Sequence, residues 1–149
     1  KRAAIIDSQT GRLVCTLFAD FRRQAQVAAF HPNLPILAIA SSDGVIQLWN
    51  IDTSRKIAEM TENGLGAVYG LQFSRDGQRL LSGSHDKTIR LWDWTIGSVL
   101  LKISHPATPV DVCFSPDGLS IACAYYMPNS CRIYRAIPLA VLQGSQSEQ

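Results

Sequence analysis

The sequence predicts an all-β protein built from repeated four-stranded antiparallel units. The first observation is a meander in residues 73–94, where turn signals at 75–77 and 85–87 separate three short runs of strand-forming residues. The second is that aromatic markers of this stretch recur 41 to 43 residues apart. The markers are Phe30, Phe73 and Phe114, and Trp49, Trp92 and Tyr134. The third is an Asp-Gly turn signal in each repeat. A period of about 40–45 residues with four strands per unit predicts the blades of a β-propeller.

Residues 1–20 are expected to form the last two strands of a blade. Ala3–Asp7 lies 43 residues before the Trp49 strand and alternates with Ala4 and Ile6 on one face. Leu13–Phe18 follows a turn and is expected to be the fourth, outer strand. The first two strands of this unit have no counterpart in the sequence, so the sequence starts in the middle of a blade.

Two complete blades are predicted at residues 21–62 and 63–104. In the first of them, Pro32 and Pro35 fall in the turn between two strands, where a missing N–H removes no ladder hydrogen bond. The expected strands are 26–30, 36–40, 45–51 and 56–60 in one blade, and 69–73, 79–84, 88–92 and 99–104 in the other.

A last blade is predicted at residues 105–142, with strands at 110–114, 120–125 and 131–134. Pro138 and the polar tail at 143–149 argue against its possible outer strand, 139–142. About three and a half blades result. Such an arc has open ends that natural proteins avoid, so we expect the ring to be closed by the rest of its own chain or, as the alternative, by a second copy.

The repeat in residues 73–94 resembles the WD-repeat (WD40-type) family, with Leu91-Trp92-Asp93 matching its defining motif. The resemblance implies that the predicted arc belongs to a ring of seven blades. It also implies a polar network in each blade, formed by His, Ser or Thr, Asp and Trp. An indole N–H buried between sheets needs an acceptor, because an unpaired one costs ~1–3 kcal/mol.

No blade keeps all four members of the implied network. The departures are Gly64 and Phe21 at the His position, Ile39 and Cys123 at the Ser position, and Tyr134 at the Trp position. The members that match, with Tyr134 in the Trp position, are Ser82, Asp86, Trp92, Asp43, Trp49 and His105. We interpret all of them as structural, because blade networks fix strand orientation rather than perform chemistry.

Composition excludes several classes of protein. The net charge of +2 is too small to predict nucleic-acid binding. The four cysteines have no metal-ligand spacing, and two of them, Cys113 and Cys123, lie in apolar runs where a thiol packs as a small hydrophobe. Buried free thiols indicate a reducing, intracellular setting, cytoplasmic or nuclear. No apolar run is long enough to predict a membrane span.

The resemblance further implies that the loops before inner strands and the turns after second strands gather on one rim that binds partners. The loop at 20–26 carries Phe and Arg, which are enriched at interface hot spots. His85, in a turn, is the one histidine with a predicted functional position. The candidate rim residues are Phe21, Arg22, Arg23, Ser42, Leu65, His85, Met127 and Asn129.

The sequence therefore predicts a non-catalytic WD-repeat scaffold that binds a protein or peptide partner within a multi-subunit assembly. It contains no nucleophile elbow, phosphate-binding glycine loop or metal motif, and we expect no catalytic residue, cofactor or metal. The alternatives are a nucleic-acid-associated subunit of a larger complex and a regulatory sensor propeller in a longer multidomain protein.

Overall fold

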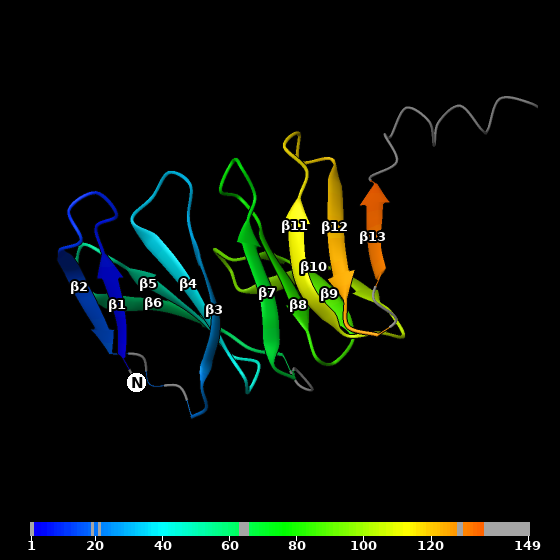
Figure 1. Cartoon of the computed structure of the whole chain (residues 1–149), viewed down its shortest axis with the longest axis horizontal. Helices are drawn as coiled ribbons and strands as arrows, with labels where there is room; N and C mark the ends of the chain where they lie inside the picture. Colours follow the sequence, from blue (N-terminus) through cyan, green and yellow to red (C-terminus); the bar gives the residue numbers. More distant parts are fainter. Residues whose placement is uncertain (1, 19, 21, 63–65, 128–129, 136–149) are drawn as a thin grey trace, which may run out of the picture.

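The computed structural model describes residues 2–18, 20, 22–62, 66–127 and 130–135 (Figure 1). This part of the chain contains thirteen β-strands and no helix, so the prediction of an all-β protein is confirmed. The strands are β1 (Arg2–Ile6), β2 (Leu13–Phe18), β3 (Ala25–Phe30), β4 (Ile36–Ser41), β5 (Ile46–Asn50), β6 (Arg55–Met60), β7 (Val68–Phe73), β8 (Leu80–Ser84), β9 (Thr88–Asp93), β10 (Ser98–Ser104), β11 (Pro109–Phe114), β12 (Ser120–Tyr125) and β13 (Ser130–Arg135).

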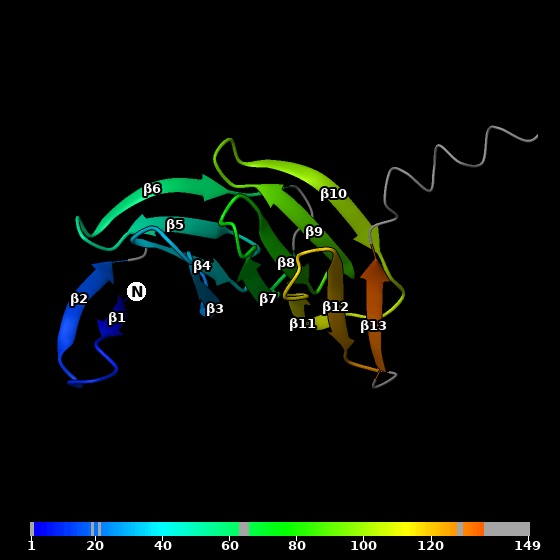
Figure 2. The same cartoon turned by 90° about the horizontal axis from the view of Figure 1, so that it is seen from above.

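The strands form four antiparallel sheets, in each of which the strands neighbour one another in chain order. Two sheets have four strands, β3 to β6 and β7 to β10; β1 and β2 form a two-stranded sheet, and β11 to β13 a three-stranded one. Seen from above, the sheets stand side by side along an arc, with β3, β7 and β11 on its inner side and β6 and β10 on its outer side (Figure 2). This is the arrangement of blades in a partial β-propeller. The possible outer strand at 139–142 lies outside the described residues.

Three apolar cores lie between successive sheets, one at each junction. The core between the two four-stranded sheets includes Leu48, Met60, Phe73, Leu80 and Trp92. A second joins β1 and β2 to β4 and β5, and a third joins the β7 to β10 sheet to the last one. Because neighbouring sheets cover both of their faces, β4 and β8 are buried along their whole length. Each blade is therefore stabilised mainly by its neighbours, as in other repeat proteins.

The Asp-Gly pairs do not occupy one position in the repeat. Gly77 and Gly118 lie in the turns after the inner strands β7 and β11, whereas Gly44 lies in the turn between β4 and β5. All three glycines have positive φ, of +74°, +73° and +84° respectively, which a residue without a Cβ adopts readily. The predicted turn chemistry is therefore present, but the pairs are not equivalent markers of the period.

Candidate partner-binding rim

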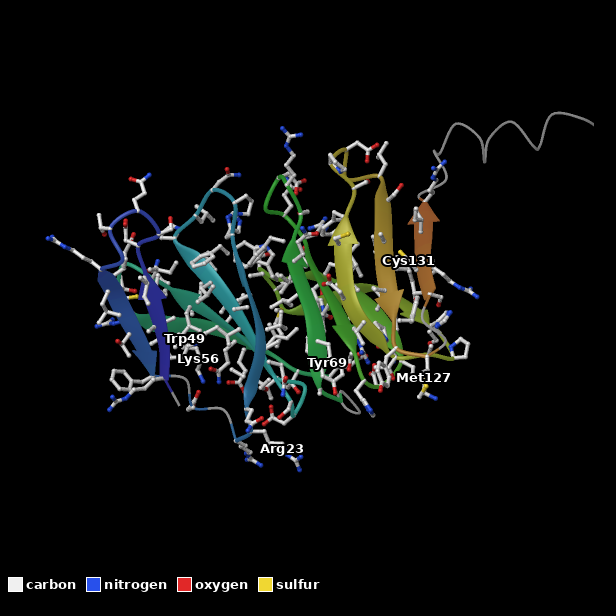
Figure 3. The ribbon with its side chains drawn as sticks, viewed as in Figure 1. Arg23, Trp49, Lys56, Tyr69, Met127 and Cys131 are labelled. Carbon is white, nitrogen blue, oxygen red and sulfur yellow. The ribbon has the colours of Figure 1, made fainter. Side chains whose placement is uncertain are left out.

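The loops before β3, β7 and β11 and the turns after β4, β8 and β12 lie at one end of the sheets, which we call the lower rim. In Figure 1 this rim is the lower edge of the molecule. Arg23, Tyr69 and Met127 all lie along it in Figure 3. The turns after the inner strands lie at the opposite end, which we call the upper rim.

Between the last two sheets, the lower rim contains an aromatic pocket with a volume of about 380 Å³. It is lined by Tyr69, His85, Thr108, Val110 and Tyr126. The rings of Tyr69 and His85 meet edge to face, with centroids 6.3 Å apart at an interplanar angle of 70°. Tyr126 is 64% exposed and Tyr69 is 37% exposed. Both tyrosine rings are therefore accessible from solvent.

A repeated backbone hydrogen bond fixes the position of the pocket. The N–H of the first residue after the second strand of each blade donates to a carbonyl in the loop before the inner strand. The three bonds are Ser42 to Gln24 at 2.8 Å, His85 to Ala67 at 2.8 Å and Tyr126 to Thr108 at 3.0 Å. The backbone is thus the same in three blades while the side chain changes from Ser to His to Tyr.

Two exposed residues beside the pocket have a backbone that side chains rarely adopt. Lys87 has φ = 67° and Met127 has φ = 60°, and Met127 is exposed. The Lys87 carbonyl accepts a hydrogen bond from the His105 N–H, which ties the turn after β8 to the loop before β11. These turns are therefore held in position although their side chains face solvent.

The structure places the predicted rim residues unequally. Arg22, Arg23 and Met127 are exposed on the lower rim, His85 lines the aromatic pocket, and Ser42 is half-buried. Phe21, Leu65 and Asn129 lie outside the described residues. Four pocket residues, Tyr69, Thr108, Val110 and Tyr126, are absent from the predicted set. The period of 41 to 43 residues could have found Tyr126, because it follows β12 as His85 follows β8, 41 residues earlier.

The Trp92 indole bonds to the serine of the predicted network and not to its aspartate. The Trp92 Nε1–H donates to the Ser82 hydroxyl at 2.8 Å, and both side chains are buried. Asp86 instead accepts hydrogen bonds from the Thr88 hydroxyl at 2.6 Å and the Thr88 N–H at 3.1 Å. Its other oxygen lies 2.8 Å from the Arg90 guanidinium. The Asp86 carboxylate is therefore bonded by Thr88 and Arg90 and not by the Trp92 indole.

The other predicted network residues also bond within their own blade. Trp49 Nε1–H donates to Gln47 Oε1 at 3.3 Å, and Asp43 accepts from the Ser41 hydroxyl. In the last blade, the Tyr134 and Tyr125 hydroxyls are 2.6 Å apart. His105 Nδ1 accepts a hydrogen bond from the Ala107 N–H at 3.1 Å, and the His105 ring stacks on Tyr125 with ring centroids 3.9 Å apart. Burial raises the pKa of the Tyr125 phenol, so it stays neutral.

Comparison with known proteins identifies the repeat. The family model "WD domain, G-beta repeat" matches residues 23–50 and 55–93. The chain contains repeats of the WD-repeat family. WD-repeat proteins are generally scaffolds for protein interaction and are generally non-catalytic. The expected fold and family are confirmed.

The WD-repeat chain is similar to parts of several longer proteins. It is 39% identical over 89 residues to apoptotic protease-activating factor 1 of Danio rerio, covering 60% of this chain and 7% of that protein. It is 35% identical over 119 residues to the WD repeat-containing protein SL1-17 of Schistosoma mansoni, covering 79% and 38%. It is 31% identical over 111 residues to the small ribosomal subunit protein RACK1y of Oryza sativa, covering 74% and 30%. The chain thus spans less than two fifths of the length of each.

Both complete WD blades contain a buried polar side chain two residues before the Trp, which the sequence analysis missed. Arg90 is 1% exposed and its guanidinium contacts Glu62, Asp86 and Thr88. Gln47 is also buried, and its Nε2 donates to Asp20 at 2.6 Å and to Glu59 at 3.1 Å. Asp20 and Glu62 lie in the loops before β3 and β7, where the family has His. These side chains therefore clamp the lower-rim loops to the third strand of each blade.

The clamps also determine the charge of the carboxylates. Burial raises the pKa of Asp86, but hydrogen bonds from Thr88 and Arg90 and the Arg90 charge outweigh it and hold the pKa below the usual 3.8. Hydrogen bonds from Gln47 and Lys56 likewise lower the pKa of Asp20. Hydrogen bonds from Glu59 and Asp20 raise the pKa of Lys56. All these groups are charged near neutral pH.

Replacing Arg90 with Met is expected to lower the free energy of unfolding by about 2–4 kcal/mol, because Glu62 and Asp86 would face each other without a cation. Gln47→Met is the matched control in the preceding blade. It removes the corresponding hydrogen bonds between the third strand and the loop before the inner strand, but it leaves no unpaired charge. Its expected cost is about 1–2 kcal/mol. Urea denaturation measures both values. Equal losses would show that the Arg90 charge contributes nothing beyond its hydrogen bonds.

The cysteine prediction needs a correction. Cys123 is buried and burial raises the pKa of its thiol, but Cys113 is exposed. Cys113 follows the buried Val112 in β11, and neighbouring residues of a strand point to opposite faces. Within the described ranges, no group of three or more His, Cys, Asp or Glu side chains could hold a metal ion. In the same residues, no helix could cross a membrane.

Proposed function

We propose that this WD-repeat chain is a non-catalytic scaffold that binds a protein or peptide partner on the lower rim, within an intracellular multi-subunit assembly. The aromatic pocket formed by Tyr69, His85 and Tyr126 is the observation that carries the proposal. Exposed aromatic side chains on a rigid backbone contribute large contact area and lose little conformational entropy on binding. Membership of a larger assembly is supported by RACK1y, a relative that is named as a small ribosomal subunit protein.

We further propose that the arc is part of a closed ring, completed by the rest of its own chain rather than by a second copy. Both end sheets expose large apolar side chains, with Ile6, Val14 and Phe18 on one and Ile133 on the other. A gap of about 400 Å³ separates β1 from β3 and is lined by apolar residues such as Ile5, Val27 and Leu37. Adjacent blades of a ring would cover such surfaces. Seven blades would match the family resemblance.

The test of the proposed function is the combined replacement of Arg22, Arg23 and His85 with Ala. These side chains are exposed on the lower rim, so we expect partner capture to fall by about tenfold or more while the melting temperature stays the same. Proteins captured from a cell lysate by the wild-type chain and by the variant are quantified by mass spectrometry.

The control for this test replaces Arg12, in the turn between β1 and β2, and Arg55, at the start of β6, with Ala; both are exposed and lie outside the lower-rim loops and turns. Partners that depend on the lower rim should be retained by this control and lost by the triple variant. Partners retained equally by both variants would place the binding surface elsewhere on the chain. Retention of every partner by the triple variant would contradict the proposed site.

A further inference from the structure

The charges on the lower rim are unequally matched. The carboxylates of Asp20, Glu62 and Asp86 are each held by the clamps described above. By contrast, Arg22, Arg23 and Lys87 are exposed and form no ion pair with any residue that the structure describes. The lower rim therefore offers three uncommitted cations. One carboxylate of this rim, Asp43 in the turn after β4, likewise forms no ion pair with a described residue, so uncommitted positive charge exceeds negative charge there, although the chain as a whole has a net charge of only +2.

The aromatic pocket on the same rim is mainly apolar. Its lining contains two tyrosine rings, the edge-to-face imidazole of His85, a valine and a threonine, and it contains no carboxylate. The volume of about 380 Å³ is near the lower end of the ~300–1,000 Å³ range of ligand pockets. A pocket of this size and lining fits one large apolar side chain.

The electrostatics decide between possible occupants. A methylated lysine would gain cation–π contacts with the tyrosines, but the exposed Lys87, two residues after His85 in the same turn, would repel it. Single-stranded nucleic acid could stack on the rings, but a continuous phosphate backbone following this rim would pass Asp20, Glu62 and Asp86. A short acidic peptide needs only a few separate cations and no continuous row of them.

We propose that the lower rim recognises an acidic peptide segment that inserts a Leu or aromatic side chain into the aromatic pocket and pairs its carboxylates with Lys87, Arg22 and Arg23. This inference rests on the proposed function and specifies its partner. Tyr69, Tyr126 and Val110 hold the apolar side chain, and Lys87 is the nearest cation to the pocket along the chain. Met127, exposed next to Tyr126, extends the apolar contact surface.

The test uses a random peptide library displayed on phage and selected against the full chain. We expect the selected peptides to combine a net negative charge with a Leu, Phe or Trp side chain. One selected peptide, made synthetically, should bind about tenfold or more weakly to the Tyr126→Ala and Lys87→Glu variants. The affinities are measured by fluorescence anisotropy at two salt concentrations, and higher salt should weaken binding.

Two matched variants serve as controls. Phe30→Ala removes an exposed aromatic ring at the upper end of β3, and Lys102→Glu reverses an exposed charge on the outer strand β10. Neither should change the affinity. Selected peptides that are basic or uncharged, yet lose binding in the Arg22, Arg23 and His85 variant, would overturn the acidic partner and leave the proposed function standing.

Two other outcomes would overturn the proposed function or change the class of partner. Peptides that bind all lower-rim variants as tightly as the wild type would overturn the proposed function as well. Tighter binding of a single-stranded oligonucleotide of mixed sequence than of any selected peptide, with a steep dependence on salt, would replace the peptide by a nucleic acid.

Discussion

Replacing Gly77 with Ala is expected to lower the free energy of unfolding by about 2–5 kcal/mol. Part of this cost is backbone strain, because Gly77 has φ = +74°, a conformation that costs ~1–2 kcal/mol for a residue with a Cβ. The rest is steric, typically ~1–3 kcal/mol when a packed site is overfilled. A Cβ at this position would lie 2.3 Å from His31 Nε2 and 2.4 Å from His31 Cε1.

His31 cannot move aside without breaking other interactions. Its Nδ1 accepts hydrogen bonds from the Asn33 and Leu34 N–H groups at 3.1 and 3.0 Å, so the proton lies on Nε2, which donates to the Gly77 carbonyl at 3.1 Å. The ring packs edge to face on Phe73 and Trp94. The Trp94 Nε1–H donates to the same carbonyl at 2.7 Å. These hydrogen bonds and ring contacts join the turn after β3 to the turn after β7, and so join the two complete blades.

The matched control is Gly118→Ala, at the equivalent turn of the last blade. Gly118 has φ = +73°, but its added Cβ would meet no atom within 4 Å. This variant therefore carries the strain of about 1–2 kcal/mol without the clash. Urea denaturation of the two variants separates the terms. Equal shifts in the two proteins would mean that the His31 contact does not hold the blades together.

The fold was predictable because its signal is repeated. Each blade supplies an independent copy of the turns and strands, so Phe30, Phe73 and Phe114 fix the same point of the repeat three times. The burial of whole strands such as β4 also follows from stacking, which replaces the usual alternation by a continuous apolar run. An Asp-Gly pair alone does not show its position in the repeat, since a turn signal is local and fits any turn. The spacing from the Phe markers does show it, because Gly77 and Gly118 each follow their Phe by four residues and Gly44 follows Phe30 by fourteen.

The polar contacts were less predictable than the strands, because they depend on which of several nearby partners is closer. The family network suggested that Asp86 and Trp92 belong to one set of hydrogen bonds. In the structure, the Asp86 carboxylate instead pairs with Arg90 and accepts a hydrogen bond from Thr88. Arg90 reads in sequence as an ordinary exposed strand residue, since arginine is almost never fully buried unless it is paired. Its pairing with Glu62 joins residues that are far apart in the sequence, and only the fold brings them together.

The aromatic pocket illustrates the same limit at the site. His85 was predictable because it lies in a turn, but Tyr69 and Val110 lie near the starts of inner strands, where an exposed and a buried residue look alike in sequence. What exposes them is the gap between two sheets at the lower rim. The site therefore results from the packing of two blades, whereas the sequence describes each blade alone.

Replacing Trp92 with Ala is expected to cost about 3–5 kcal/mol, the usual cost of truncating a large buried aromatic residue. Trp92 is 1% exposed and belongs to the core between the two complete blades, with Leu48, Met60 and Leu80. Its removal leaves a cavity in a core that both blades share. It also leaves the buried Ser82 hydroxyl without the indole N–H at 2.8 Å.

Further variants separate the cost of the cavity from the cost of the lost hydrogen bond. Trp92→Phe keeps most of the ring volume and removes the N–H, so we expect a loss of about 1–2 kcal/mol, close to that of Ser82→Ala, which removes the acceptor and leaves a buried donor. If the hydrogen bond is the shared cause, combining the two replacements should cost less than the sum of the single losses.

Asp86→Asn in the Trp92→Ala protein should cost as much as in the wild type, because Asp86 bonds to Thr88 and Arg90 and not to the indole. A smaller cost in the Trp92→Ala protein would show that the carboxylate depends on Trp92 after all. Unfolding in urea, followed by circular dichroism, measures each of these differences.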